Sequence, residues 1–320
     1  MADRRAALRG LAGAGGLLLL VIVPPYLSSF MLTLLTQALI YGILAMSLDI
    51  ILGYTGLASL GHAAYLGLGA YSVGILTMRY GAGFWTALVV GVLLAGAVAA
   101  IFGLVALRAT GVYFLMITLA LGMVVWGLAH RWVSMTQGDN GISGVPRPDL
   151  GIGVSFAQGV PFYYLALAAF LLAFLALRLL VRSPFGKSLV GIRESESRMR
   201  TLGYHVWLHK YIGFVVAGAV GGFAGVLWAY YNGFVSPADL ELATSVEALL
   251  MVALGGRGTL LGAPLGAVII VLLKNLVSVY THRWLLILGA VYIGTIVYAP
   301  EGILGAVRQW MKGDKAWARS

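Results

Sequence analysis

Three ionisable residues, Asp49, Glu247 and Lys274, lie within long apolar stretches of this chain. A charge at the centre of a membrane helix costs about 3 kcal/mol or more, so such residues commonly contact a substrate, carry protons or hold helices together. Each also has a simpler interpretation. Asp49 lies near one end of its stretch, where water could hydrate it, and Glu247 follows Thr244 and Ser245, where it could cap a helix. Lys274 could pair with either acid or extend toward the membrane surface.

A second group of charged residues forms a polar segment, residues 183–210, between two apolar runs. From residue 187 to 203 there is no proline, and two acid–base pairs have the four-residue spacing and the order that support a helix. These pairs are Glu194 with Arg198 and Glu196 with Arg200. The pattern predicts a short amphipathic helix over 187–203 that ends at Gly203. Its apolar side would consist of Leu189, Ile192, Met199 and Leu202.

Such a helix fits two roles, docking into a groove on a cytosolic protein or resting on lipid, and its spacing alone favours neither. ATP binding by the segment itself is excluded. Gly186, Lys187 and Ser188 match the end of a phosphate-binding P-loop, but Val181 stands where the first glycine belongs. An apolar run rather than a strand precedes them, so the chain does not bind ATP by that route.

The composition defines the class of protein. With 61% apolar and 10% charged residues and a mean hydropathy of +0.95, the 320-residue chain has too little polar surface for a soluble protein. We predict an all-α polytopic membrane protein. The net charge of +10 comes from basic residues at the ends of apolar runs, so nucleic-acid binding is excluded. Without cysteine, spaced histidines or a hydrolase motif, the sequence predicts no enzyme, metal or redox cofactor.

Ten apolar segments are long enough, or nearly so, to cross the roughly 30 Å hydrocarbon core, which needs about 20 helical residues. They cover residues 11–27, 31–52, 63–77, 84–107, 112–133, 165–181, 212–230, 243–254, 260–279 and 285–298. The eighth is short and could be a broken or re-entrant helix. Pro24 and Pro25 end the first without a cleavage site, which favours an uncleaved span. The chain, 1–320, is interpreted as a single transmembrane domain.

The basic residues indicate the orientation. With the N-terminus in the cytoplasm, four arginines fall in outer loops, Lys274 lies in a span, and the remaining Lys and Arg lie inside. The outer four are Arg79, Arg131, Arg147 and Arg283. Both termini and residues 183–210 are then cytoplasmic, and residues 137–160, rich in Gly, Pro and Asp, form the largest external loop. The tail, 301–320, has the spacing of an amphipathic helix at the inner surface, with a plain anchoring tail as the alternative.

Two glycine-rich stretches, residues 53–74 and 254–267, interrupt apolar sequence. Glycine-broken helices in both halves of a transporter indicate a binding site at the membrane midplane, because freed backbone groups there can meet a ligand. The second span runs inward and the seventh outward. A repeat of spans two to five in spans seven to ten would therefore be inverted, although residue-level similarity between the halves is faint.

Seven stretches spread over nearly the whole chain resemble, in their order, the membrane permeases of ABC importers for branched-chain amino acids, in particular the M-type subunits. They are residues 49–74 (DIILGYTGLASLGHAAYLGLGAYSVG), 111–121 (GVYFLMITLAL), 138–146 (GDNGISGVP), 183–203, 233–237 (GFVSP), 245–267 and 299–304 (APEGIL). The sequence departs from the family pattern at Asp49, where we expect asparagine, and Lys274 is also unusual.

The resemblance implies a type II ABC importer permease fold in a bacterial cytoplasmic (inner) membrane. The implied partners are a second, homologous permease, two cytosolic ATPase subunits that hydrolyse ATP, an external solute-binding protein and membrane lipid. The segment 183–210 would be the coupling loop, with ATPase coupling residues Gly191, Arg193, Glu194, Ser195, Glu196, Arg198 and Gly203. The substrate pathway would be lined by Asp49, Ser59, His62, Tyr113, Thr118 and Glu247.

Several alternatives stay open at this point. His62 could be a hydrogen-bonded packing residue rather than a pathway residue. Related permeases look similar for urea, short amides or other small acids, so the sequence does not identify the solute. A stand-alone ion-coupled transporter using Asp49 and Glu247 is a second class of function. A membrane scaffold or intramembrane enzyme is a third, which the lack of a catalytic constellation disfavours.

Overall fold

The computed structural model describes residues 18–151, 153, 155–156, 159–280, 286–287, 289–291, 293–294 and 302–305. The long helices are α2 (Ser29–Asp49), α3 (His62–Tyr80), α4 (Phe84–Ala106), α5 (Val112–Arg131), α7 (Gly159–Arg182), α10 (Val206–Asn232), α11 (Leu242–Gly255) and α12 (Gly262–Tyr280). The short elements are η1 (Pro24–Tyr26), η2 (Ile50–Tyr54), α6 (Val133–Thr136), η3 (Gly138–Asn140), β1 (Ile142–Ser143), α8 (Pro184–Glu194), α9 (Glu196–Thr201), β2 (Phe234–Val235) and η4 (Pro237–Leu240).

The second to ninth predicted segments each coincide with a long helix. Within the described residues, six helices are long and apolar enough to cross a membrane, counting α2 with its π-helical continuation η2 as one. The short eighth segment is α11, with 14 residues. Residues 11–17 of the first predicted segment, half of the residues 285–298 and most of the tail 301–320 lie outside the described residues. The chain is therefore a mostly helical, polytopic membrane protein, and the total of ten spans stays a prediction.

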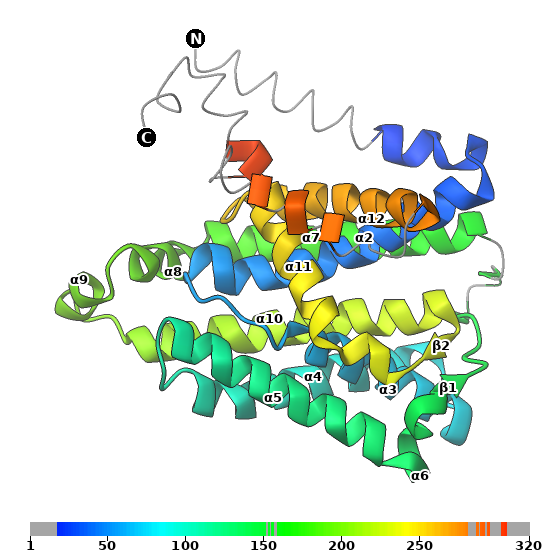
Figure 1. The fold of residues 1–320 in the computed structure, drawn as a ribbon, viewed down its shortest axis with the longest axis horizontal. Helices are drawn as coiled ribbons and strands as arrows, with labels where there is room; N and C mark the ends of the chain where they lie inside the picture. The colour runs from blue at the N-terminus through cyan, green and yellow to red at the C-terminus, as the bar shows by residue number, and fades with distance from the viewer. Residues whose placement is uncertain are drawn as a thin grey trace.

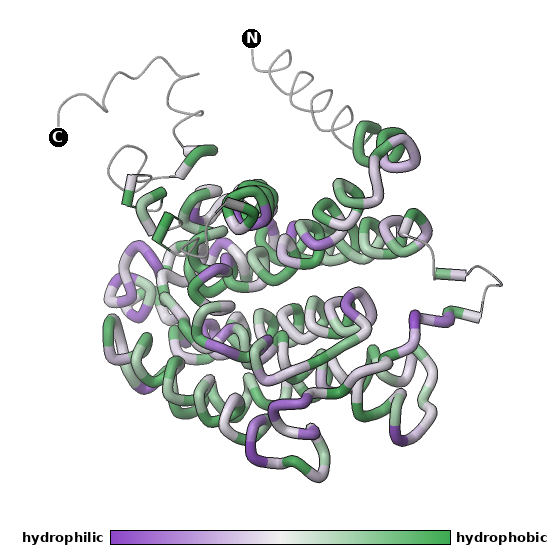
Figure 2. Tube along the Cα trace, turned by 45° about the vertical axis from the view of Figure 1, so that its right-hand side comes forward, coloured by the Kyte–Doolittle hydropathy of each residue, from purple (hydrophilic) through white to green (hydrophobic). Residues whose placement is uncertain are grey.

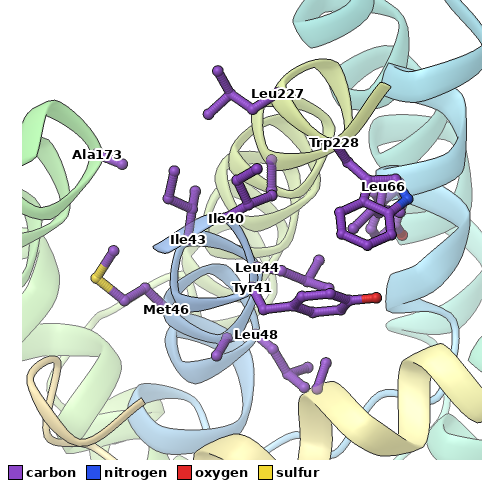
Figure 3. Packing of buried hydrophobic residues seen from close by; sticks show 14 of the residues in the cluster. Ile40, Tyr41, Ile43, Leu44, Met46, Leu48, Leu66, Ala173, Leu227 and Trp228 are labelled. Carbon is purple, nitrogen blue, oxygen red and sulfur yellow. The ribbon is translucent and has the colours of Figure 1, made fainter. Parts of the chain in front are cut away.

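Helix α2 forms the centre of the bundle. It is apolar all round, as expected of a buried helix. In its most apolar stretch of 18 residues, 89% of the residues are buried. Helices α7, α10, α11 and α12 pack around it. Figure 3 shows Tyr41 of α2 near Trp228 of α10 and Leu66 of α3, and Ile43 and Met46 of α2 on the side toward Ala173 of α7. The Tyr41 ring meets the Trp228 ring edge to face, with 5.0 Å between centroids.

Helices from the two halves of the chain pack against each other. Helix α2 packs on α11 and α12, and α10 packs on α3 and α4. Glycines allow the close approach of α10: a Cβ on Gly225 would lie 1.8 Å from the Leu66 carbonyl oxygen of α3, and one on Gly222 would lie 2.3 Å from Ala95 Cβ of α4. The glycines spaced four apart on α10 therefore form packing surfaces, as small residues commonly do between membrane helices.

The two ends of the bundle differ. Helices α8 and α9 lie at one end and strands β1 and β2 at the other (Figure 1). The strands pair antiparallel, Ile142 with Val235, and so join two of the stretches that carry the family resemblance. Arg147 fastens the segment that follows β1 to α10 by donating to the carbonyls of Tyr230 and Tyr231 at 2.8 and 2.7 Å. Hydrophilic residues gather in loops and near helix ends, and the long helices are mainly hydrophobic (Figure 2).

Candidate functional site

The polar segment folds as two short helices, α8 and α9, rather than one. The Ser183 hydroxyl caps α8, which ends at Glu194. Ser195 then has an extended backbone (φ −162°, ψ 103°), and its Oγ accepts the N–H of Arg198 at 3.3 Å, so it caps α9. The prediction of one helix over 187–203 is therefore wrong. Serine is a strong N-cap and competes with the interior of a helix for backbone hydrogen bonds.

The break rearranges the predicted acid–base pairs. Glu194 and Arg198 no longer lie one turn apart on a helix, and both are exposed. Glu196 pairs with Arg200 at 3.5 Å and lies closer to Lys210 of α10. Lys210 is only 6% exposed, so this ion pair fastens α9 to the bundle.

The apolar side of the segment is buried except at its end. The buried members are Leu189, Ile192 and Met199, whereas Leu202 is 65% exposed. Gly191 faces Met199, because a Cβ at this glycine would lie 2.8 Å from the methionine sulfur. Gly203 has a φ of +84°, a left-handed conformation that favours glycine after a helix.

Arg193, near the end of α8, turns toward the bundle. The residue as a whole is exposed, but its Nη1 donates a close hydrogen bond to the carbonyl oxygen of Gly53 in η2. The last carbonyls of a helix lack intrahelical partners and carry partial negative charge, which a cation stabilises. Arg193 therefore caps the end of the α2–η2 helix, and α8 lies beside that end (Figure 1).

Asp49 lies one turn before Gly53 and is fully buried. Its Oδ1 accepts the N–H of Gly258, in the turn between α11 and α12, at 2.8 Å. Among the described residues its Oδ2 has no hydrogen-bond partner, and the Arg193 guanidinium is a positive charge that acts on the carboxylate. The interpretation of Asp49 as a hydrated helix-end residue is wrong. The carboxylate instead joins α2 to the α11–α12 turn.

Glycines make this meeting possible. A Cβ on Gly53 would lie 2.0 Å from Asp49 Oδ1 and 2.2 Å from the Gly258 nitrogen. Gly56 and Gly258 have φ angles of +76° and +71°, and a Cβ at either would come within 2.9 Å of an atom of the Arg193 side chain. The two glycine-rich stretches thus meet at one point. We call Asp49, Gly53, Gly56, Arg193 and Gly258 the arginine node.

Three of the predicted pathway residues gather where residues 55–61 pass beside α5 to the start of α3. Ser59, His62 and Thr118 are all buried, with at most 3% of each exposed. Thr118 Oγ1 of α5 accepts the N–H of Leu60 at 3.2 Å. Hydroxyl groups and a histidine from three different segments therefore line one buried region.

His62 is the first residue of α3 and links it to α2. Its Nε2 lies 2.9 Å from the Ser47 hydroxyl. Because that hydroxyl donates to the Leu44 carbonyl at 2.7 Å, it accepts from Nε2, which makes Nε2 the protonated nitrogen. The other ring nitrogen, Nδ1, is buried and finds no hydrogen-bond partner in the part of the chain that the structure describes.

Glu247 joins α11 to α12 instead of capping a helix. It is 4% exposed, and its Oε1 accepts from Lys274 Nζ at 2.7 Å. Helix α11 begins at Leu242 and has no acid in its first turn, so the capping interpretation is wrong. Two residues before Glu247, Ser245 Oγ accepts the N–H of Ala63 at 2.9 Å, which ties α11 to the start of α3.

Tyr113 lies apart from these residues, since it is 78% exposed near the start of α5. Sequence reasoning did not identify Gly53, Gly258, Ser245 or Lys210 as site residues. The glycine-rich stretches were a signal for the first two. The contacts of Ser245 and Lys210 span 182 and 14 residues of sequence, and no local pattern predicts them.

A bundle of apolar helices that buries charged pairs and has a charged helical segment at one end is the architecture of a membrane transport protein. The family model described as "Branched-chain amino acid transport system / permease component" matches residues 30–296. The chain belongs to this family. It is a permease subunit of an ATP-driven ABC importer, not an enzyme, and it works within an ABC transporter complex.

Individual relatives agree with this assignment. The high-affinity branched-chain amino acid transport system permease protein LivM of Escherichia coli K12 is 31% identical, over 92% of this chain and 75% of the relative. The probable LivM of Methanocaldococcus jannaschii is 25% identical, over 83% and 90%. The guanosine ABC transporter permease protein NupQ of Bacillus subtilis is 28% identical over 34% and 37%. No solved structure matches.

Proposed function

We propose that this chain carries branched-chain amino acids across a bacterial cytoplasmic membrane. Its partners would be a second, homologous permease, two cytosolic ATPases and an external solute-binding protein. The observation that carries the proposal is the α8–α9 segment at one end of the bundle, with Glu194 and Arg198 exposed. Exposed charges on short, fixed helices suit docking into a groove of another protein better than burial in lipid.

The proposed coupling residues have distinct parts in this segment. Glu194 and Arg198 would contact the ATPase directly, and Ser195 would set the angle between α8 and α9. Glu196 would hold α9 on α10 through its ion pair with Lys210. Gly191, packed under Met199, and Gly203, in the turn after α9, would keep the segment compact.

The proposed pathway runs past the buried region at Ser59, His62 and Thr118 and along Glu247. Polar atoms from α2, α3, α5 and α11 converge there, as at broken helices that form transport sites. Tyr113, exposed on α5, would face the second permease. Membrane lipid would cover much of α4, α5 and α7, because only 22–28% of the residues in the most apolar stretch of each helix are buried.

We also propose the full topology: ten spans, both termini in the cytoplasm and an inverted repeat. The packing between the two halves supports the repeat. The first helix of each proposed repeat, α2 or α10, packs on the second and third helices of the other. The bias of basic residues supports the orientation, with residues 137–160 outside and the tail 301–320 inside.

Glu194→Arg tests the docking role. We expect the variant to insert into the membrane normally and to lose most uptake, because a reversed charge on a docking surface repels its partner. The measurement is uptake of radiolabelled L-leucine by liposomes containing the complete transporter, together with ATP hydrolysis. Lys187→Gln, an exposed change on the same helix, is the control. Unchanged uptake in Glu194→Arg would contradict the coupling role of α8.

The substrate class needs its own test, because one relative is named for guanosine. Uptake of labelled L-leucine is measured in competition with L-valine, guanosine, urea and acetamide. Strong competition by L-valine alone supports the branched-chain substrate, whereas competition by guanosine, urea or acetamide assigns the pathway to another small solute. Leucine uptake by the purified chain without ATPase subunits, driven by a proton or sodium gradient, would instead support an ion-coupled transporter.

A further inference from the structure

One side chain of the α8–α9 segment reaches the transmembrane helices at the point where both glycine-rich stretches meet. Arg193 donates to the Gly53 carbonyl across 140 residues of sequence. Gly258 donates to Asp49 across 209 residues, at 2.8 Å. Three segments distant in sequence, α8, the α2–η2 helix and the α11–α12 turn, therefore come together around one guanidinium group.

We propose that Arg193 is a positioning residue that passes movement of α8 to the inner ends of α2 and of the α11–α12 hairpin. This inference rests on the proposed function, in which α8 and α9 receive motion from the ATPase. It adds that the motion enters the membrane domain through the arginine node, at a residue that itself touches neither ATP nor the transported solute.

The shape of the node restricts what Arg193 can do. Its stem passes Gly56 and its guanidinium reaches Gly258, at distances that leave no room for a Cβ on either glycine. Both glycines have left-handed φ angles, which other residues adopt at a cost. Arg193, although exposed as a whole, thus has backbone on two sides, and a movement of α8 that carried this side chain toward either turn would displace that turn.

The hydrogen bonds of the node are suited to a two-state contact. Gly53 belongs to a π-helical segment, a geometry that is rare and frequent at functional sites. Asp49 Oδ2 is buried and has no hydrogen-bond partner within the described ranges, so this oxygen can accept a further hydrogen bond. A small shift of the Arg193 guanidinium would exchange its contact with the Gly53 carbonyl for one with Asp49. Contacts with two discrete arrangements are what couples distant sites.

The test compares Arg193→Gln, Asp49→Asn and the double variant in the complete transporter, reconstituted in liposomes with its binding protein. The readout is the amount of L-leucine taken up per ATP hydrolysed. We expect Arg193→Gln to lower this ratio at least about tenfold, the effect of losing one charge-assisted hydrogen bond, while ATP hydrolysis continues. Asp49→Asn keeps an acceptor for Gly258 and should lower the ratio less.

The double variant should be no worse than Arg193→Gln alone, because both changes act on one link. Multiplied losses in the double variant, or a normal ratio in Arg193→Gln, would overturn the proposal. Arg193→Lys keeps the positive charge with a single-point donor and should recover part of the ratio. Lys187→Gln, on the same helix, should keep the wild-type ratio.

A second readout separates transmission from mere stability. The chain contains no cysteine, so Arg257→Cys, in the exposed part of the α11–α12 turn, places a single reporter next to Gly258. We expect its rate of reaction with a maleimide to differ between nucleotide-free and ATP-trapped transporter. The difference should disappear in Arg193→Gln and persist in Lys187→Gln. A difference that persists in Arg193→Gln would refute the link.

Failure of this inference can be told apart from failure of the proposed function. If Glu194→Arg abolishes uptake while Arg193→Gln transports normally, α8 docks the ATPase but the arginine node does not transmit its motion. If both variants transport normally, the α8–α9 segment is not the ATPase contact, and both proposals are refuted.

Discussion

Asp49 and Glu247 are both carboxylates buried in apolar helices, but their charges are balanced in different ways. Glu247 accepts from Lys274 at 2.7 Å, and the two residues lie on α11 and α12, consecutive helices joined by a short turn. Asp49 accepts from a backbone N–H, and a cation that acts on it, Arg193, belongs to α8, a half-buried helix at the end of the bundle. One carboxylate is balanced within a hairpin and the other across the molecule.

This difference separates a structural charge from one that can respond to a partner. Helices α11 and α12 can move together without breaking the Glu247–Lys274 pair. Any movement of α8 relative to α2, by contrast, changes the surroundings of Asp49. We therefore expect changes at the Glu247–Lys274 pair to affect stability first, and changes at the arginine node to affect transport first.

Lys274→Met should have the largest effect on stability. The change leaves the Glu247 carboxylate, whose side chain is 5% exposed, without this cation, and removing one partner of a buried ion pair costs about 3–5 kcal/mol. The measurement is the free energy of unfolding of the purified chain in mixed micelles. If Lys274→Met is instead neutral, the pair is hydrated and the contrast with Asp49 fails.

The matched control for this prediction is the double variant Glu247→Gln with Lys274→Met. Neutralising both partners removes the uncompensated charge, and replacement of a whole buried pair is often neutral. We expect the double variant to recover most of the lost stability. L-leucine uptake by the double variant then tests whether Glu247 also acts in the substrate pathway. Normal uptake would show that Glu247 has a structural role alone.

The helices could be predicted from sequence because their signal is local. A run of about 20 apolar residues identifies a span whatever it packs against, and the second to ninth predicted segments are helices accordingly. The single helix predicted over 187–203 is wrong because the four-residue spacing of the acid–base pairs contributes less than the N-cap that Ser195 provides for α9. A polar residue inside a short helical pattern is a break signal as well as a surface signal.

The site could be predicted only in part, because its contacts are long-range. The sequence marks Asp49 and Glu247 by their charge in apolar sequence and offers Lys274 as a partner of either acid, but it does not indicate that Lys274 pairs with Glu247 rather than with Asp49. The Asp49–Gly258 contact involves a backbone N–H, which leaves no trace in residue type. By sequence, Arg193 is one of several charged residues in its segment, like Glu194. Only the structure shows that the Arg193 side chain donates to the Gly53 carbonyl.

Gly53→Ala tests whether the close packing of the arginine node is needed for transport. Alanine normally favours a helix over glycine by about 1 kcal/mol, but here its Cβ would lie 2.0 Å from Asp49 Oδ1 and 2.2 Å from the Gly258 nitrogen. We expect an overpacking cost of about 1–3 kcal/mol and a loss of L-leucine uptake per ATP that exceeds the loss of folded protein. Gly127→Ala, on α5 with no atom within 4 Å of its Cβ, should be neutral in both measurements. Equal behaviour of the two variants would contradict the tight node.

Ser245→Ala tests whether the region around Glu247 depends on its ion pair alone. The Ser245 hydroxyl accepts the N–H of Ala63 at 2.9 Å, and its removal leaves a buried donor unpaired at the start of α3. We expect a loss of about 1–3 kcal/mol in the free energy of unfolding, smaller than for Lys274→Met. Ser245→Thr, which keeps a hydroxyl, should recover part of it. A loss as large as that of Lys274→Met would mean that hydrogen bonding between α11 and α3, rather than charge pairing, dominates this region.

Asp239 is a third carboxylate and should show the smallest effect. It lies in η4, outside the membrane-spanning helices, and accepts from Trp228 Nε1 at 2.8 Å and from the Ser236 N–H at 3.0 Å. Burial raises the pKa of Asp239 above its ordinary value of 3.8, and these two hydrogen bonds lower it by less. The folded state thus binds the proton more tightly than the unfolded state, so the contribution of Asp239 to stability is full below the ordinary pKa and is lost as the pH rises through the raised value.

Asp239→Asn should remove this decline in stability, seen as a flatter dependence of the melting temperature on pH. An unchanged pH dependence would show that a buried carboxylate with two N–H donors stays ionised without a cation, which would weaken the case that Asp49 depends on Arg193.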